Sequence, residues 1–412
     1  MTAVPATQKP KQNPTQNPTR SATRNTGRNV AIVGVALSDC GRVDDATPYA
    51  LHAQAARRAL ADAGLERSAI DGLASAGLGT LAPVEVAEYL GLRPTWVDST
   101  SVGGSTWEVM AAHAADAIAA GHANVVLLVY GSTARADVKA GRRTGNLSFG
   151  ARGPLQYEVP YGHTLIAKYA MAARRHMHEY GTTLEQLASV AVQARTNAAA
   201  NPEAMFRTPI TVDDVLSSAP IAAPFTKLHC CIRSDGGAAV VLAAEEYVRD
   251  CRPTTPVRIL GTGEYTSHTT MSEWPDFTVS PAAVSGRLAF ERAGVRPSEI
   301  DFAEIYDAFT YMTLVTLEDL GFCAKGEGGA FVEKDRLTLT GDLPVNTDGG
   351  GLSAQHPGMR GLFLLVEAVR QLRGEAEARQ IRTPTGDLPR LAVASGTGGW
   401  FCSSGTVVLG RE

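Results

Sequence analysis

The chain has 412 residues, 44% of them hydrophobic, and a formal net charge of −4. Its length exceeds the usual size of a single core, so two domains or one large duplicated fold is expected. The weak negative charge gives no electrostatic reason to expect a nucleic acid as partner, and the sequence contains no apolar run as long as a membrane span. Residues 1–28 are rich in Pro, Thr, Asn and Gln, contain no acidic residue and predict a disordered tail.

The first buried strand is predicted at residues 29–36, NVAIVGVA. A continuous apolar run rich in β-branched residues is typical of a strand that is covered on both faces. A helix follows, since Thr47 and Pro48 provide a capping residue and a proline at the first helical position. The helical period then continues through YALHAQAARRALADAG to a glycine stop at Gly64. These residues predict a βα unit.

The same unit returns later in the chain. ALADAGLERSAID at 59–71 aligns without a gap with AFERAGVRPSEID at 289–301, an offset of 230 residues, and a strand precedes each copy. A glycine-rich turn, a helix and a buried strand also recur, as SVGGSTWEVM to NVVLLVYG and as NTDGGGLSAQHPGMRG to RLAVASG. We therefore expect two equivalent α/β halves, an N-terminal one at 29–250 and a C-terminal one at 251–412.

An insertion is predicted within the N-terminal half at residues 132–230. It contains two alanine-rich helical segments with apolar stripes, at 161–181 and 183–202. An insertion of this kind over a core commonly shapes a substrate pocket, and equally often it forms a dimer or cap surface.

Four motifs in these halves are specific when they are taken together. They are DGGAAVVL at 235–242, EIYDAFTYMTLVTLEDLGFC at 304–323, NTDGGGLSAQHPGMRG at 346–361 and GTGGWFCSSGTVVLG at 396–410. With the duplicated halves, they make the chain resemble the thiolase superfamily, in particular its bacterial lipid-transfer-protein and sterol-carrier-protein branch. The resemblance implies a duplicated five-layer αβαβα fold, usually dimeric, that holds a CoA thioester as substrate between its halves.

The residues that a thiolase uses as nucleophiles are changed in this chain. In a typical thiolase the helix after the glycine turn begins with a reactive cysteine, whose pKa the helix dipole lowers. That position falls on Gly103 or Gly104 here, and the second thiolase cysteine is also absent. Ser105 is not expected to replace the thiol, because an alcohol needs a general base. Ser105 or Thr106 is instead expected to be an ordinary N-cap of the helix.

Two side chains with acid or base chemistry remain at the family's site positions. Tyr306 and Asp307 stand where typical thiolases have His or Asn followed by Glu, and His356 keeps the base position before Pro-Gly. This set is similar to the side-chain-cleaving aldolases of the same branch, which have tyrosines in place of thiols. Those aldolases work with a small OB-fold, zinc-ribbon (DUF35) partner. The chain departs from their pattern, because they typically carry a tyrosine where His356 stands.

The resemblance implies chemistry by acid and base alone. Retro-aldol cleavage of a β-hydroxyacyl thioester needs a base for the hydroxyl proton, donors for the developing enolate and an acid to protonate it. We expect Tyr306 and His356 to form the acid/base pair, with Asp307 and Asp348 orienting it. The remaining candidates bind the substrate carbonyl or form an oxyanion hole from backbone amides: Gly103, Gly104, Ser105, Asn346, Gly398 and Gly399.

Two other functions fit the same residues. One is an acyltransferase or condensing enzyme in which two bound substrates react directly, without an acyl-enzyme. The other is a non-catalytic subunit that binds a CoA thioester, an acyl carrier or a lipid while a partner performs the chemistry.

No tightly bound cofactor is expected. No metal site is expected either, because His176 and His178 face different sides of their helix. The six cysteines form no CxxC pair, and such reduced thiols favour a cytoplasmic protein.

Overall fold

The computed structural model describes residues 28–79, 81–142, 153–162, 164–248 and 255–411. The predicted tail lies outside the described residues, apart from Arg28. A nine-stranded sheet in the order β3-β2-β4-β7-β1-β8-β11-β10-β9 forms the centre of the fold. The strands are β1 Val30–Leu37, β2 Gly72–Ala74, β3 Trp96–Asp98, β4 Val125–Ser132, β7 Gly236–Ala244, β8 Val257–Thr266, β9 Phe302–Ile305, β10 Leu391–Gly398 and β11 Ser403–Gly410, with a separate hairpin of β5 Pro220–Ala222 and β6 Phe225–Thr226.

The strand pattern repeats about the middle of the sheet. In the first half β7 is antiparallel to both β1 and β4, and β4 is parallel to β2. In the second half β11 is antiparallel to both β8 and β10, and β10 is parallel to β9. The halves join where β1 pairs with β8, at Ile32↔Val257 and the neighbouring pair. The predicted duplication is therefore confirmed, whereas the boundary at 250/251 lies outside the described residues and the insertion bounds 132–230 stay a prediction.

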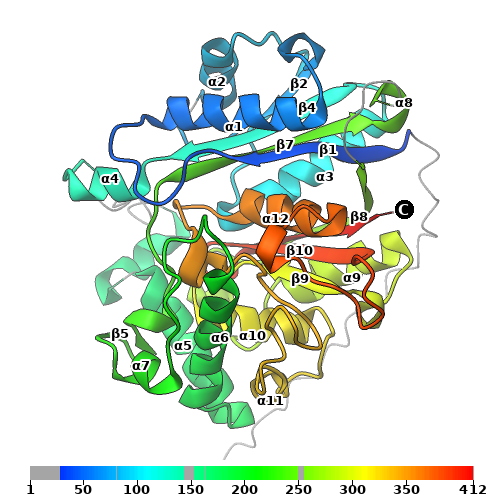
Figure 1. Ribbon diagram of the computed structural model, residues 1–412. Coiled ribbons are helices and arrows are strands. Elements are labelled where there is room, and N and C mark those ends of the chain that lie inside the picture. The colour runs from blue at the N-terminus through cyan, green and yellow to red at the C-terminus, as the bar shows by residue number, and fades with distance from the viewer. Residues whose placement is uncertain (1–27, 80, 143–152, 163, 249–254, 412) are drawn as a thin grey trace, which may run out of the picture.

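Helices on three levels cover and separate the two halves of the sheet (Figure 1). α1 and α2 lie over the first half, α9 and α10 lie over the second, and α3 and α12 lie between the halves. This is the predicted five-layer αβαβα fold. The helices are α1 Pro48–Ala63, α2 Ala82–Leu90, α3 Thr106–Ala119, α4 Ala134–Lys139, α5 Leu165–Tyr180, α6 Leu184–Ala199, α7 Val212–Ser217, α8 Glu245–Val248, α9 Ala282–Ala293, α10 Thr310–Asp319, α11 Gly328–Phe331 and α12 Gly361–Arg373.

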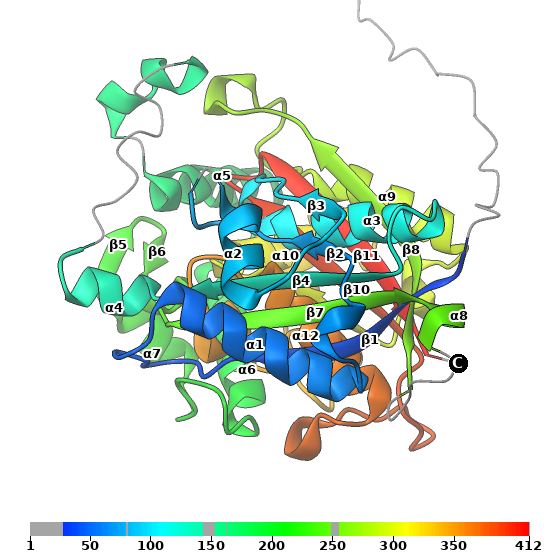
Figure 2. The ribbon, with the colours of Figure 1, turned by 90° about the horizontal axis from the view of Figure 1, so that it is seen from above.

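The sequence repeat has a packing reason in both halves. From above, α1 runs along β7 and β1 (Figure 2), and a Cβ atom added at Gly34 of β1 would lie 2.2 Å from the carbonyl oxygen of Ala59 in α1. The corresponding atom at Gly261 of β8 would lie 2.3 Å from the carbonyl oxygen of Ala289 in α9. Only glycine allows a strand and a helix to approach so closely. The alanine that recurs at 59 and 289 therefore marks the same helix–strand contact twice.

The first βα unit forms as predicted. Thr47 accepts a hydrogen bond from the backbone amide of Ala50, Pro48 is the first residue of α1, and Gly64 ends the helix with a φ of 65°. The two helices predicted in the insertion are α5 and α6. Among the described residues, no helix combines the length and the apolar character that crossing a membrane would need.

The insertion helix α6 fixes the backbone in front of His356. α6 packs against α10 and against a π-helical turn at Gly350–Ala354. The Asn197 side chain donates a hydrogen bond of 3.0 Å to the carbonyl oxygen of Val345. Asn201, just after α6, donates one of 2.9 Å to the carbonyl oxygen of Asp348. Part of the insertion therefore holds the loop that carries the predicted base.

Candidate active site

The candidate site lies at the N-terminal ends of the two central helices. A 3-10 turn at Gly103–Ser105 precedes α3, and the loop that carries His356 precedes α12. The two helix ends are in contact, since a Cβ atom added at Gly361 would lie 2.7 Å from the carbonyl oxygen of Gly104. Both helices direct the positive ends of their dipoles toward this region, which favours developing negative charge there.

Tyr306 and His356 form the predicted pair. Tyr306 follows the end of β9, and its hydroxyl lies 3.1 Å from Nε2 of His356. The two rings meet edge to face, at 87° and 5.6 Å between centroids. Tyr306 is 5% exposed, whereas His356 is partly exposed. The pair therefore has one buried member and one member that solvent or a substrate can reach.

Both members of this pair are neutral at pH 7. Burial raises the pKa of the Tyr306 phenol well above its usual range. Burial, together with the positive charge of Arg360, lowers the pKa of His356 to about 4. A neutral imidazole can accept a proton at Nε2 and a neutral phenol can donate one, so a proton can pass along this hydrogen bond.

The Tyr306 ring packs against Gly104, one of the two positions at which the resemblance to thiolases places the nucleophile. A Cβ atom added at Gly104 would lie 2.5 Å from Cζ of Tyr306 and 2.4 Å from the carbonyl oxygen of Thr397. Gly103 adopts a φ of 82°, and its added Cβ would lie 2.6 Å from the backbone nitrogen of Gly399. The glycine loops at 103–104 and 398–399 are therefore packed against each other, as their assignment to one oxyanion hole requires. That assignment stays a prediction.

Ser105 occupies the N-cap position of α3, as predicted. Its side chain makes no capping hydrogen bond to the helix, however. Its fully buried hydroxyl lies 2.9 Å from the hydroxyl of Ser403, which donates a hydrogen bond of 2.7 Å to the carbonyl oxygen of Val102. The Thr106 hydroxyl accepts the amide hydrogen of Val102 at 3.0 Å. The Ser105 side chain thus joins the two halves instead of offering a group to substrate.

Asp307 supports the His356 loop. Its carboxylate accepts hydrogen bonds from the backbone amides of Gly351 at 2.7 Å and Leu352 at 3.2 Å. It also lies 3.5 Å from Nε of Arg360. Burial raises the pKa of Asp307 to about 6, although Arg360 and the two amides oppose that rise. Asp307, which is expected to act with the acid/base pair by orienting it, has the contacts of a positioning residue.

Arg360 joins two buried carboxylates beneath the site. Its guanidinium donates a 2.6 Å hydrogen bond to Asp348, and its other terminal nitrogen donates to the carbonyl oxygen of Gln355 at 3.0 Å. Arg360 and Asp307 are both fully buried. Although burial acts to raise the pKa of Asp348, the Arg360 charge lowers it below its usual range. The predicted orienting residues therefore act on the loop through an arginine that the sequence prediction did not include.

Asn346 has a structural contact beside its expected role in substrate binding, which stays a prediction. Its side-chain oxygen accepts a 2.7 Å hydrogen bond from the backbone amide of Ile305, the residue before Tyr306. The oxygen is therefore engaged by the end of β9 and fixes the start of the Tyr306 segment.

Two further contacts hold the backbone at His356 and Pro357. The His356 amide donates a hydrogen bond to the Ser234 hydroxyl at 2.9 Å, and the Tyr130 hydroxyl donates one to the carbonyl oxygen of Pro357 at 2.7 Å.

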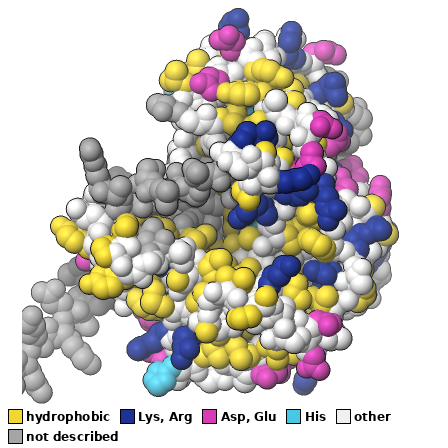
Figure 3. All heavy atoms as spheres, turned by 90° about the vertical axis from the view of Figure 1, so that its left-hand side faces the viewer, with side chains coloured by type: hydrophobic (Ala, Val, Ile, Leu, Met, Phe, Trp, Pro, Cys, Tyr) yellow, Lys and Arg dark blue, Asp and Glu magenta, His cyan; other side chains and the backbone are white. Residues whose placement is uncertain are grey.

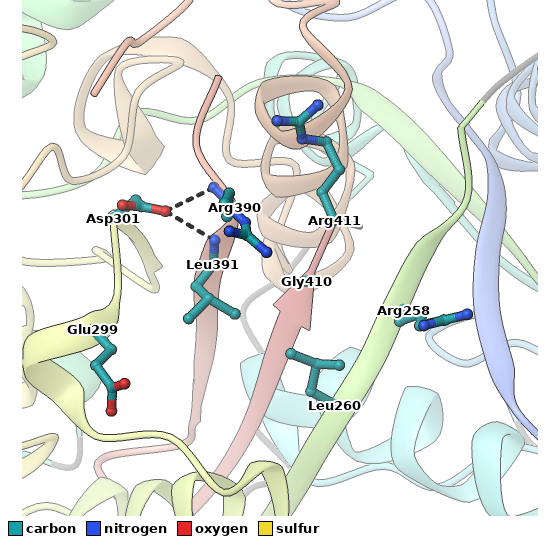
Figure 4. A pocket seen from close by; sticks show the side chains of 8 residues that line it. All are labelled: Arg258, Leu260, Glu299, Asp301, Arg390, Leu391, Gly410 and Arg411. Atoms are coloured by element: carbon teal, nitrogen blue, oxygen red, sulfur yellow. Dashed lines mark hydrogen bonds between the residues drawn. The ribbon is translucent and has the colours of Figure 1, made fainter. Parts of the chain in front are cut away.

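A groove elsewhere on the molecule is distinct from this site. It has a volume of about 560 Å³ and is lined by residues at the start of β10 and the end of β11, including Leu391 and Gly410 (Figure 4). Tyr306 and Gly398 lie at the opposite ends of these strands. In the described part of the chain, no three His, Cys, Asp or Glu side chains form a group that could hold a metal ion.

Comparisons with known proteins identify the family of the chain. Residues 263–411 match the family model described as "Thiolase C-terminal domain-like". A steroid side-chain-cleaving aldolase of Thermomonospora curvata is 35% identical over 379 residues, 89% of this chain and 95% of that protein. An acetyl-CoA acetyltransferase of Methanothermobacter thermautotrophicus is 34% identical over 364 residues, 85% of this chain and 93% of that protein.

A solved structure extends the similarity to the three-dimensional fold. The structure of an Ltp2-ChsH2(DUF35) aldolase matches with a TM-score of 0.83 and 32% identity, and the match covers 93% of this chain and 98% of that one. The similarity thus extends over nearly the whole length of both chains. The chain belongs to the thiolase superfamily, in its lipid-transfer and sterol-carrier branch.

Proposed function

We propose that this chain is an aldolase that cleaves a β-hydroxyacyl-CoA thioester by a retro-aldol reaction. The observation that carries the proposal is the neutral Tyr306–His356 pair, 3.1 Å apart, beside Gly104, one of the two positions at which the resemblance to thiolases places the nucleophile. A relative that covers nearly the whole chain is named a steroid side-chain-cleaving aldolase, so we infer a bulky, steroid-like acyl group as the first substrate to test.

In the proposed reaction a single proton moves from oxygen to carbon. His356 accepts the proton of the β-hydroxyl group, and the electrons of the bond between the α and β carbons move toward the thioester carbonyl. A ketone or aldehyde leaves, and the resulting enolate is held by amides at Gly103–Gly104 and Gly398–Gly399. Tyr306 protonates the α carbon and recovers its proton from His356 through their hydrogen bond.

A covalent acyl-enzyme is disfavoured by the thiols near the site. Cys402 follows the last glycine turn, and burial raises the pKa of its thiol to about 11. Burial likewise raises the pKa of Cys231 to about 12. A thiol reacts as its thiolate, so both groups are poor nucleophiles at neutral pH. The acyltransferase alternative, favoured by the similarity to an acetyl-CoA acetyltransferase, would therefore need direct reaction between two bound substrates.

The proposed partners are CoA, a second copy of the chain and a small DUF35 protein. Lys and Arg side chains gather in the middle of the face shown in Figure 3, where they would attract the phosphates of CoA. β3 is an edge strand with Val97 51% exposed, so we propose that a homodimer covers this edge. The DUF35 partner is proposed because a similar aldolase structure is named with one.

Replacing Tyr306 with Phe tests the proposed acid. We expect Tyr306→Phe to lower kcat by about 100-fold, since loss of a general acid costs this much or more. The measurement is release of the carbonyl product from a β-hydroxyacyl-CoA, with and without the DUF35 partner. Unchanged kcat would exclude Tyr306 as the acid. Transfer of the acyl group to a second acceptor, without carbonyl release, would favour the acyltransferase alternative.

Adding one methyl group at Gly104 tests the geometry of the site. The alanine Cβ would overlap the Tyr306 ring, so Gly104→Ala should displace the phenol and lower kcat by about 100-fold, the cost of a 1 Å misplacement. Gly121→Ala is the control, because a Cβ atom added at Gly121 would meet no atom within 4 Å, although the φ of 78° makes alanine unfavourable there as well. Equal kcat values for the two variants would contradict the proposed position of Tyr306.

A further inference from the structure

One hydroxyl group of the insertion holds the last glycine turn of the fold. Tyr169 lies on α5 and is 1% exposed. Its hydroxyl donates a hydrogen bond of 2.9 Å to the carbonyl oxygen of Gly399. The phenol oxygen of Tyr169 in turn accepts a 3.1 Å hydrogen bond from the backbone amide of Phe401. The phenol therefore bridges two backbone groups of the turn between β10 and β11.

The turn that Tyr169 bridges has an unfavourable backbone conformation. Phe401 adopts a φ of 59°, in the left-handed region, which is unfavourable for a residue with a Cβ atom. Such a conformation persists where the surroundings determine it. Phe401 is fully buried, and its ring packs edge to face on Tyr169 with 4.8 Å between centroids. Both the ring and the hydroxyl of Tyr169 thus hold this residue.

A second contact from α5 reaches the same turn. The Lys168 ammonium group lies 3.9 Å from the centroid of the Trp400 ring and is paired with Glu158. The Glu158 carboxylate also accepts a hydrogen bond from the amide of Met271. Two consecutive residues of α5, Lys168 and Tyr169, therefore contact three consecutive residues of the turn, Gly399, Trp400 and Phe401.

The turn is also part of the candidate oxyanion hole. The backbone nitrogen of Gly399 lies 2.6 Å from the position of a Cβ atom on Gly103, in the glycine loop beside the Tyr306 ring. A small displacement of the Gly399 peptide would therefore move an amide relative to the reacting atoms. Donors of this kind act on the transition state only when they are held in place before the reaction.

We propose that Tyr169 is a positioning residue that sets the Gly398–Phe401 turn for stabilisation of the enolate. This inference rests on the proposed aldolase function and extends it to helix α5 of the insertion. It predicts a defect in turnover without a defect in substrate binding, because the amides act mainly on charge that develops in the transition state.

The test compares two buried tyrosines. Tyr169→Phe removes the bridging hydroxyl and keeps the ring. Tyr311→Phe is the matched control, since Tyr311 is also fully buried, packs edge to face on Phe401 and donates its hydroxyl hydrogen to the carbonyl oxygen of Phe277. We expect Tyr169→Phe to lower kcat by about 10- to 100-fold with KM within about threefold, and Tyr311→Phe to change both values less than threefold.

Hydrogen exchange of the amides at 396–403 gives a readout that does not need turnover. Faster exchange in Tyr169→Phe than in Tyr311→Phe is expected. Equal exchange and equal kcat in the two variants would overturn the proposal, as would a Tyr169→Phe defect confined to KM. The two proposals can also fail separately. Suppose that the unaltered protein binds β-hydroxyacyl-CoA without cleaving it, and that amide exchange at 396–403 increases only in Tyr169→Phe. The aldolase function then fails, while the role of Tyr169 in holding the turn is supported.

Discussion

Replacing His356 with Ala should lower kcat by about 10²- to 10⁴-fold, the usual contribution of a general base. The expectation rests on the contact of its Nε2 with Tyr306 and on its partial exposure beside a buried phenol. The change is measured as release of the carbonyl product from a β-hydroxyacyl-CoA. His178→Ala is the control, because His178 is exposed on α5. A His356→Ala variant within tenfold of the unaltered protein would contradict the assignment.

Protonation of His356 should determine the pH at which kcat/KM falls in acid. Burial lowers the pKa of His356 to about 4, so the neutral, proton-accepting form persists as the pH falls well below 6.5. We therefore expect kcat/KM of the unaltered protein to be nearly constant between pH 7 and pH 5.5. A histidine with the usual pKa of about 6.5 would instead lose about tenfold over this range. A loss of that size would indicate an exposed, ordinary imidazole.

Replacing Arg360 with Leu should destabilise the fold by about 3 to 5 kcal/mol, because it leaves the buried carboxylates of Asp307 and Asp348 without their shared cation. The free energy of unfolding is measured by urea denaturation at pH 7. Arg370→Leu provides the comparison: Arg370 pairs with Glu203 at 2.6 Å, but both side chains are partly exposed. An exposed pair contributes about 1 kcal/mol or less.

Replacing the two carboxylates tests whether unpaired buried charge causes the expected loss of stability in Arg360→Leu. Adding Asp307→Asn and Asp348→Asn to Arg360→Leu removes the buried negative charges and should recover part of the lost stability. If Arg360→Leu and Arg370→Leu are equally stable, the buried cluster does not hold the loop as described. If the triple variant is less stable than the single one, lost packing at Arg360 outweighs the unpaired charge.

The fold could be predicted because its signals are local and repeated. β1 and α1 follow from an apolar run, a capping threonine, a proline and a glycine within a short stretch of chain. The duplication follows from an alanine that faces a strand glycine in both halves. The Tyr306–His356 contact could be predicted from family positions, although 50 residues separate the two in sequence.

The roles of the supporting polar residues could not be predicted in the same way. Ser105 bonds to Ser403, 298 residues later in the chain, and Tyr169 bonds to Gly399, 230 residues later. Neither spacing produces a periodic pattern in the sequence. Such partners are brought together only when the nine-stranded sheet and the insertion have folded. Arg360 gave one signal: a charged residue just before the apolar run of α12, at the end of a glycine-rich loop.

The measurement that most directly tests the central claim is turnover in heavy water. The protein, with a DUF35 partner, is incubated in D₂O with a steroid-like β-hydroxyacyl-CoA, and the products are analysed by mass spectrometry. The proposed mechanism predicts a carbonyl product and a shortened acyl-CoA that carries one solvent deuterium on its α carbon. Free CoA with acyl transfer to a second molecule, or tight thioester binding without any cleavage, would contradict it.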